Sequence, residues 1–249
     1  MEPLTGTTRA ARPLVIAHRG ASADAPENTI AAFELALEQG ADAIELDIHL
    51  SRDSHPVVIH DFTLERTTDG AGPVGERTVR ELKRLDAGGW RGPGFRGQRI
   101  QTLQEVLERF RDRARFWVEI KGGSHLYPEI EERVVSTLEI YDVTERALVQ
   151  SFDLAALTQV HAINPAIALG ALVAEPPLDA PALLTGPARA ICLGAHLVNE
   201  AALGRIRREG LDCYVWTVNE ATQMEELARW GVSGIITDRP GLLRSRLGR

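Results

Sequence analysis

Cysteine and long apolar runs are both scarce in this sequence. The 249 residues include two cysteines, Cys192 and Cys213, which are too few for a disulfide framework and lie outside any CxxC metal motif. Each falls in an apolar, strand-like run, so we expect two buried free thiols. Nowhere do 18 apolar residues run together, and residues 1–12 lack the apolar stretch of a signal peptide. We therefore predict a flexible tail over 1–12, no stable membrane insertion and a cytoplasmic location.

Basic residues are fewer than acidic residues in this sequence. The formal net charge is -7, whereas binding to a nucleic-acid backbone needs a basic surface. The composition thus disfavours nucleic acid as a partner, but it leaves room for a small anionic substrate held by a local cluster of basic groups. It predicts no particular oligomeric state.

Short apolar runs alternate with amphipathic stretches along the chain. The eight predicted strands are 14–18, 43–48, 116–120, 147–151, 166–172, 190–193, 213–217 and 234–237. The predicted helices are 29–39, 103–111, 128–139, 154–163, 200–208 and 221–230; in the first, Asn28 is the expected N-cap and Gly40 the expected end. Alternating strands and helices indicate a parallel sheet, and eight such units in a chain of this length favour a (β/α)8 TIM barrel. An open doubly wound sheet is the alternative.

One further apolar run, 56–60, follows the second strand too closely for a crossover helix, since a parallel connection needs about a dozen residues. We therefore predict a β-hairpin over 47–60 that turns near 52–55 and places Asp47 opposite His60. Residues 61–101 then form a small insertion. Its Gly- and Arg-rich part, 88–97, is interpreted as an irregular loop or as a lid over substrate. The whole chain, 1–249, is expected to be one catalytic domain.

Acidic side chains recur with the period of a β-strand. Glu45 and Asp47 share one face of the second strand, and Glu119 and Lys121 share one face of the third. Apolar residues alternate with them, so we expect the carboxylates to face the barrel axis. Singly, each would form an ordinary salt bridge or an exposed strand end; three together need a neutralising cation. All-oxygen ligation by Glu45, Asp47 and Glu119 favours Mg²⁺, Ca²⁺ or Mn²⁺ over zinc.

Two histidines and two basic residues complete the candidate site. His18 ends the first strand and His60 ends the hairpin, and such a pair can serve as general acid and general base near neutral pH. Arg19 and Lys121 are candidates for binding phosphate oxygens. Trp216, at the end of the seventh strand, is either a wall of the substrate site or part of the core.

These residues belong to motifs that run in order along nearly the whole chain. The motifs are His18-Arg19-Gly20, Pro26-Glu27-Asn28-Thr29, Glu45-Leu46-Asp47, Pro56-Val57-Val58-Ile59-His60-Asp61, Glu119-Ile120-Lys121, Ser151-Phe152-Asp153, Trp216-Thr217-Val218-Asn219 and Thr237-Asp238-Arg239-Pro240. Together they resemble the glycerophosphodiester phosphodiesterase family.

The resemblance implies a (β/α)8 barrel with an insertion after the second strand, a metal site at Glu45, Asp47 and Glu119, and an acid–base pair of His18 and His60. It also implies metal-dependent hydrolysis of glycerophosphodiesters to sn-glycerol 3-phosphate and an alcohol. Two positions depart from the family pattern. Ser54 replaces a turn glycine, so we expect an altered hairpin tip, and Gln101 replaces a proline.

Other functions remain open at this point. A phospholipase D-like enzyme acting on lysophospholipid or sphingolipid would need an exposed apolar rim, for which Phe62, Trp90 and Phe95 are the candidates. A non-catalytic barrel that binds a phosphate ligand is a more remote alternative, and a sugar isomerase or aldolase would not need the paired histidines. The sequence also leaves open whether water or a substrate hydroxyl attacks phosphorus.

Overall fold

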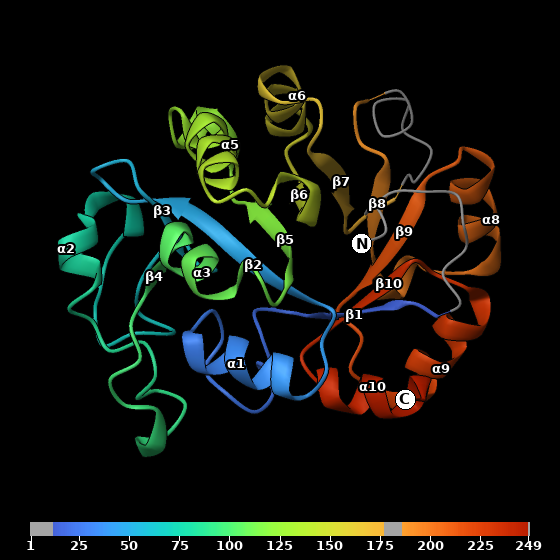
Figure 1. Ribbon diagram of the computed structural model, residues 1–249, viewed down its shortest axis with the longest axis horizontal. Helices are drawn as coiled ribbons and strands as arrows, with labels where there is room; N and C mark the ends of the chain where they lie inside the picture. The colour runs from blue at the N-terminus through green and yellow to red at the C-terminus, as the bar shows by residue number, and fades with distance from the viewer. Residues whose placement is uncertain (1–11, 177–185, 249) are drawn as a thin grey trace.

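The computed structural model describes residues 12–176 and 186–248. Eight parallel strands form a barrel (Figure 1) that closes where β1 pairs with β2. These strands are β1 (Leu14–Ala17), β2 (Ala43–Leu50), β5 (Arg115–Ile120), β6 (Ala147–Ser151), β7 (Ala168–Val173), β8 (Ala190–Gly194), β9 (Asp212–Trp216) and β10 (Gly234–Thr237). The closure confirms the predicted TIM barrel and excludes the open sheet. Of the predicted tail, 1–11 lies outside the described residues; Arg12 donates a hydrogen bond to the carbonyl of Gly248.

Helices surround the barrel, as Figure 1 shows. The longer ones are α1 (Ile30–Glu38), α3 (Leu103–Phe110), α5 (Ile130–Ile140), α6 (Leu154–Ile163), α8 (Glu200–Arg208), α9 (Ala221–Trp230) and α10 (Pro240–Leu247), and α2 (Val79–Leu82) and α4 (Gly123–Leu126) are single turns. In α3, Thr102 and Glu105 form a capping box and the apolar residues of one face are buried. Local sequence thus accounts for both the start and the orientation of this helix.

The N-cap predicted for α1 was wrong. Thr29, not Asn28, caps the helix, because its side chain accepts a hydrogen bond from the amide of Ala32. Asn28 precedes the helix with φ of 58°, and its side chain turns toward the barrel mouth instead. Gly40, with φ of 83°, follows the helix as expected.

The two faces of the barrel strands bury different groups. Outward residues such as Ile44, Leu46 and Val118 join the large core between strands and helices. Inward residues such as Trp117 and Tyr214 fill the barrel interior, and their rings pack edge to face with centroids 5.2 Å apart. Both cysteines are buried and free, as predicted. The alternation leaves the inward positions at the carboxyl ends of the strands for polar side chains.

A hairpin and an insertion follow β2. Strand β3 (Pro56–Val58) pairs antiparallel with β2, and β4 (Gln101–Thr102) pairs with β3. The chain turns at Ser51 to His55, where the amide of Ser51 donates to the carbonyl of His55. The hairpin is confirmed, but its register differs from the prediction: Ile48 lies opposite Val58, and the amide of Ile59 donates to Asp47. His60 therefore lies one position beyond the residue opposite Asp47.

The insertion packs beside the barrel. Its apolar residues form a small core of their own with the hairpin, and Figure 1 shows β3 and α2 beyond the end of β2. Within it, the carboxylate of Asp86 accepts hydrogen bonds from the amides of Gly88, Gly89 and Gly97. This loop leans on the segment before α1, since Arg91 donates to the carbonyl of Ala23. The loop is therefore an ordered part of the insertion.

Candidate active site

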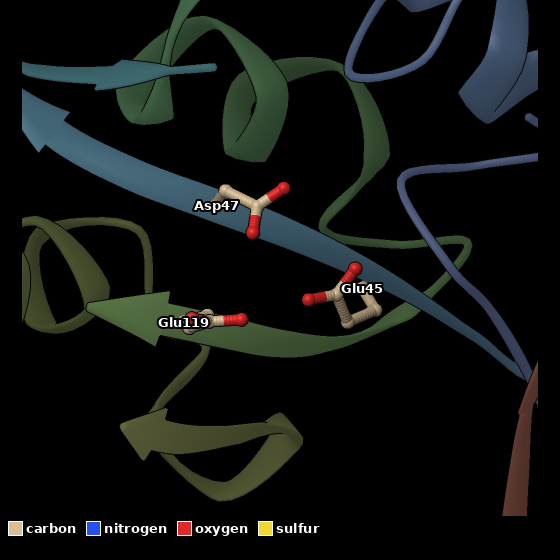
Figure 2. Close-up of side chains that lie close together, drawn as sticks. All are labelled: Glu45, Asp47 and Glu119. Carbon is tan, nitrogen blue, oxygen red and sulfur yellow. The ribbon is translucent and has the colours of Figure 1, made fainter. Parts of the chain in front are cut away.

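The metal-ligand candidates converge at the barrel mouth. Glu45 and Asp47 project from β2 and Glu119 from β5 (Figure 2), and β2 and β5 align Asp47 with Glu119. One oxygen from each carboxylate lies within 4.8 Å of the others. All three side chains are buried. Period-two alternation and strand pairing thus bring together the three carboxylates named from the sequence.

The charges of this cluster are balanced in part by two basic side chains. Lys121 Nζ lies 2.9 Å from Asp47 Oδ1 and 2.6 Å from Glu119 Oε1. Arg19 Nε lies 3.1 Å from Asp47 Oδ2, and the backbone amide of Arg19 donates to Glu45 Oε2 over 3.0 Å. Arg19 and Lys121 therefore contact the acidic cluster directly.

Burial and charge affect the three carboxyl groups differently. Burial opposes ionisation of Asp47, but Lys121 and Arg19 outweigh it and hold its pKa well below the usual range. Burial raises the pKa of Glu119 to about 7, and Asp47 adds to the rise while Lys121 counteracts it. Burial and the neighbouring carboxylates also raise the pKa of Glu45. Full ionisation of all three carboxyl groups would therefore place more negative charge here than the two basic neighbours offset.

The donor set suits a hard divalent cation. Asp47 Oδ1 and Glu119 Oε1 are buried and contact the Lys121 ammonium, whereas the buried side-chain oxygens of Asn28 and Gln150, whose amide nitrogens contact Asp47 and Glu45, have no partner. Unpaired buried oxygens are costly unless a cation or a donor satisfies them. Carboxylate and amide oxygens, with neither imidazole nor thiolate among the three clustered ligands, match a magnesium- or calcium-type site.

Each candidate histidine is backed by a carboxylate. His18 Nδ1 lies 2.6 Å from Asp238 Oδ1, and His60 Nδ1 lies 2.6 Å from Asp61 Oδ1. Since a carboxylate only accepts hydrogen bonds, each imidazole donates from Nδ1, and Nε2 is the atom left to exchange protons. Asp238 in turn accepts from Ser22 and Asn219. The histidines are therefore held in one orientation and one tautomer.

The turn after β1 explains part of the first motif. Gly20 has φ of 85°, and a Cβ there would lie 2.6 Å from the carbonyl carbon of Ala32. Only glycine fits this close approach to α1. The tight turn also directs the Arg19 amide toward Glu45.

These groups surround one cleft of about 400 Å³. Its lining contains every predicted site residue except Asp47, which lies fully buried behind Arg19 and Lys121. Apolar side chains form another wall, where Trp216 packs edge to face on Phe152 with centroids 5.7 Å apart. Trp216 Nε1 donates to the carbonyl of Cys192, which fixes the indole. Among the described residues, none from 61–101 lines this cleft.

Several polar residues at the barrel mouth were not predicted from the sequence as site residues. His49 and Gln150 point inward, and the same period-two pattern that identified Asp47 places His49 on its face. Gln150 Nε2 donates to Glu45, and Asn28 Nδ2 donates to Asp47. Glu27, Asn28, Asp61 and Asp238 stood inside the quoted motifs, but no local pattern indicated what they contact.

His49 supports the backbone at His60. Its Nε2 lies 2.9 Å from the carbonyl oxygen of His60 and its Nδ1 lies 2.9 Å from the hydroxyl of Tyr127. Burial lowers the pKa of His49 to about 4, so the ring is neutral, with its proton on Nε2. The imidazole of His49 thereby holds the strand exit that presents His60.

In enzymes with this fold, the active site lies at the carboxyl ends of the barrel strands, which is where these groups gather. Buried carboxylates fit for a cation, basic side chains and carboxylate-backed histidines in one cleft are suited to hydrolysing a phosphate ester. The fold and site define the chain as a barrel phosphohydrolase.

Comparison with known proteins narrows the class. The model of the glycerophosphoryl diester phosphodiesterase family matches residues 18–242. A glycerophosphodiester phosphodiesterase from Caldanaerobacter subterraneus is 42% identical over 236 residues, covering 93% of this chain and 96% of its own. Another, from Bacillus subtilis, is 34% identical and covers 93% of this chain and 85% of its own. The chain belongs to the glycerophosphoryl diester phosphodiesterase family.

Solved phosphodiesterase structures have the same fold as this chain. An Oleispira antarctica phosphodiesterase in complex with the product sn-glycerol-3-phosphate superposes with a TM-score of 0.89 at 32% identity, covering 94% of this chain and 96% of that one. A glycerophosphodiester phosphodiesterase from Agrobacterium tumefaciens has a TM-score of 0.82 at 33% identity, covering 93% and 98% of the two chains.

Proposed function

We propose that this protein hydrolyses small glycerophosphodiesters to sn-glycerol 3-phosphate and an alcohol, with a divalent cation held by Glu45, Asp47 and Glu119. The observation that carries the proposal is that the carboxylate cluster borders, through Glu45 and Glu119, the same cleft as both carboxylate-backed histidines. A Mg²⁺, Ca²⁺ or Mn²⁺ ion there would neutralise the negative charge that develops on the phosphate in the transition state.

The chain's own residues supply binding and proton transfer. Arg19 and Lys121 face the cleft and bind phosphate oxygens, which orients the diester. His60 accepts the proton of the attacking hydroxyl or water at Nε2. Burial lowers the pKa of His60, and the positive charges of Lys121 and Arg19 lower it further, although Asp47 has the opposite effect. His18, which also lines the cleft, donates a proton from Nε2 to the departing alkoxide. Trp216 and Phe152 give the substrate's carbon groups an apolar wall.

The assay that tests this function measures release of glycerol 3-phosphate from a panel of headgroups. We expect turnover to stop in chelator, to return with added cation, and to fall by about 10²- to 10⁴-fold in His18→Ala and in His60→Ala. His55→Ala, on the exposed hairpin tip, is the matched control. Turnover that is indifferent to chelator contradicts the cation site. Oxygen-18 from solvent, followed with and without a cyclic intermediate, distinguishes attack by water from attack by a hydroxyl.

A soluble diester suits the mouth better than a lipid. The rim residues proposed for a membrane enzyme, Phe62, Trp90 and Phe95, do not line the cleft, whose exposed aromatic side chain is Phe152. Within 12–176 and 186–248, every helix is too short or too polar to cross a bilayer. Comparing glycerophosphocholine with lysophosphatidylcholine as substrates decides between the two activities.

The proposal includes the domain organisation and location. We take the whole chain as one catalytic domain in which 61–101 is a small insertion, and its action as a lid and a cytoplasmic location stay predictions. Small-angle scattering with and without product would detect closure of a lid.

A further inference from the structure

Arg66, from the insertion, lies between two carboxylates of the site. Its guanidinium binds both oxygens of Glu27, at 2.7 and 2.8 Å, and both oxygens of Asp61, at 2.6 and 2.9 Å. Two bidentate contacts use a planar five-donor group almost fully, and a single Lys ammonium could not reproduce them. The geometry is therefore specific to arginine.

Each carboxylate continues to a residue that we assign to the chemistry. Glu27 Oε1 accepts from Arg19 over 3.0 Å. Asp61 Oδ1 accepts from His60 Nδ1 over 2.6 Å and is shared with Arg66. The path Arg19–Glu27–Arg66–Asp61–His60 thus joins the phosphate-binding arginine to the proton-accepting histidine.

The backbone that carries Arg66 is held in place. Thr68 donates through both its amide and its hydroxyl to the carbonyl of Leu64, and both residues are buried. Leu64 belongs to the small core of the insertion. The position of Arg66 therefore depends on how the insertion docks against the barrel.

The ionisation of Arg66 and of its two carboxylate partners favours a stable contact. Hydrogen bonds from Arg66, together with that of His60, outweigh burial and lower the pKa of Asp61. The two carboxylates raise the pKa of Arg66 in return. Asp61 stays ionised, and it shares its charge between Arg66 and His60.

We propose that Arg66 is a positioning residue that aligns Arg19 and His60 at once through Glu27 and Asp61, so that docking of the insertion is coupled to catalysis. This inference rests on the proposed function for its kinetic test. It assigns a task to a segment that does not line the cleft.

A thermodynamic cycle on kcat tests the coupling. Arg66→Met, assayed with glycerophosphocholine, is expected to lower kcat about 10- to 100-fold, and to lower it by a clearly smaller factor when Asp61→Asn is already present, because only the path through Glu27 then remains. Arg109→Met is the matched control: Arg109 is a similarly exposed arginine whose partner, Glu34, lies outside the cleft. Its kcat should stay within about twofold of wild type. Additive effects of Arg66→Met and Asp61→Asn, or equal kcat in the Arg66 and Arg109 variants, overturn the proposal.

A spectroscopic measurement separates positioning from general stability. The low-field proton resonance of His60 Nδ1, assigned by its loss in His60→Gln, should shift in Arg66→Met and not in Arg109→Met. If Arg66→Met does not fold, Arg66→Lys keeps the charge and loses the bidentate contacts; it should lose at least fivefold in kcat, and unchanged turnover overturns the proposal. If wild-type protein turns over no diester, the proposed function fails, whereas the resonance still tests the Arg66 contact by itself.

Discussion

Removing the divalent cation should make the stability of this protein depend on pH through Glu119. Burial raises the pKa of its carboxyl group from an ordinary value of 4.5 to about 7. The folded protein therefore binds this proton more tightly than the unfolded chain, and stability falls as pH rises from 4.5 through 7. At about 1.4 kcal/mol per pKa unit, the loss amounts to about 3 kcal/mol. Because the residue is 7% exposed, solvent screens little of this effect.

The measurement is urea unfolding of wild type and Glu119→Gln between pH 4.5 and 8, in chelator and with saturating Mg²⁺ or Ca²⁺. The glutamine variant lacks the titrating group, so the histidines contribute similarly to both proteins and cancel in the difference. In chelator, wild type should lose about 3 kcal/mol relative to the variant over this range. With cation the trend should reverse, because the ion binds the ionised carboxylate and its stabilisation grows with pH.

Two results would refute this reasoning. A wild-type-minus-variant difference that is constant with pH in chelator means that the Glu119 carboxyl is not perturbed by its burial. Equal stabilisation of wild type and Glu119→Gln by the cation means that the ion does not bind at Glu119.

Three further predictions concern His49, the hairpin tip and Trp216. His49→Phe should cost about 1–3 kcal/mol of unfolding free energy and lower kcat, because the carbonyl of His60 loses its buried donor; urea unfolding and kinetics measure both, and His49→Gln should recover part of each. Ser54→Gly should raise the unfolding free energy by about 1 kcal/mol, since Ser54 has φ of 59°; an unchanged urea midpoint contradicts this. Trp216→Leu should raise KM several-fold, and a loss of stability with unchanged KM would instead place the indole in the core.

The local pattern of apolar residues, caps and turns predicted much of the fold. Strands β6 and β10 and helices α6, α8 and α9 have the predicted bounds, because each combines a clear period with caps or turns at its ends. The hairpin was predicted from a connection too short for a helix. Its register was wrong by one residue, since pairing is set by the geometry of the turn at Ser51 to His55 rather than by the apolar pattern alone.

The fold accommodates both departures from the family pattern. Ser54 adopts the left-handed conformation that a turn glycine would favour, so the hairpin tip forms without glycine. Gln101 lies in β4 and pairs with Val58 of β3. A proline at this position would have no backbone N–H to donate to the sheet.

By itself the sequence determined which side chains share a face. The period of two aligns Glu45, Asp47 and His49 along one strand, and this alignment needs no information from distant residues. The tertiary structure decided the rest: closure of the barrel brings Asp238 to His18 across 220 residues of chain, and docking of the insertion brings Arg66 to Glu27 across 39. Such partners are chosen by the three-dimensional path of the backbone, because charged side chains carry no local signal of which opposite charge they will meet.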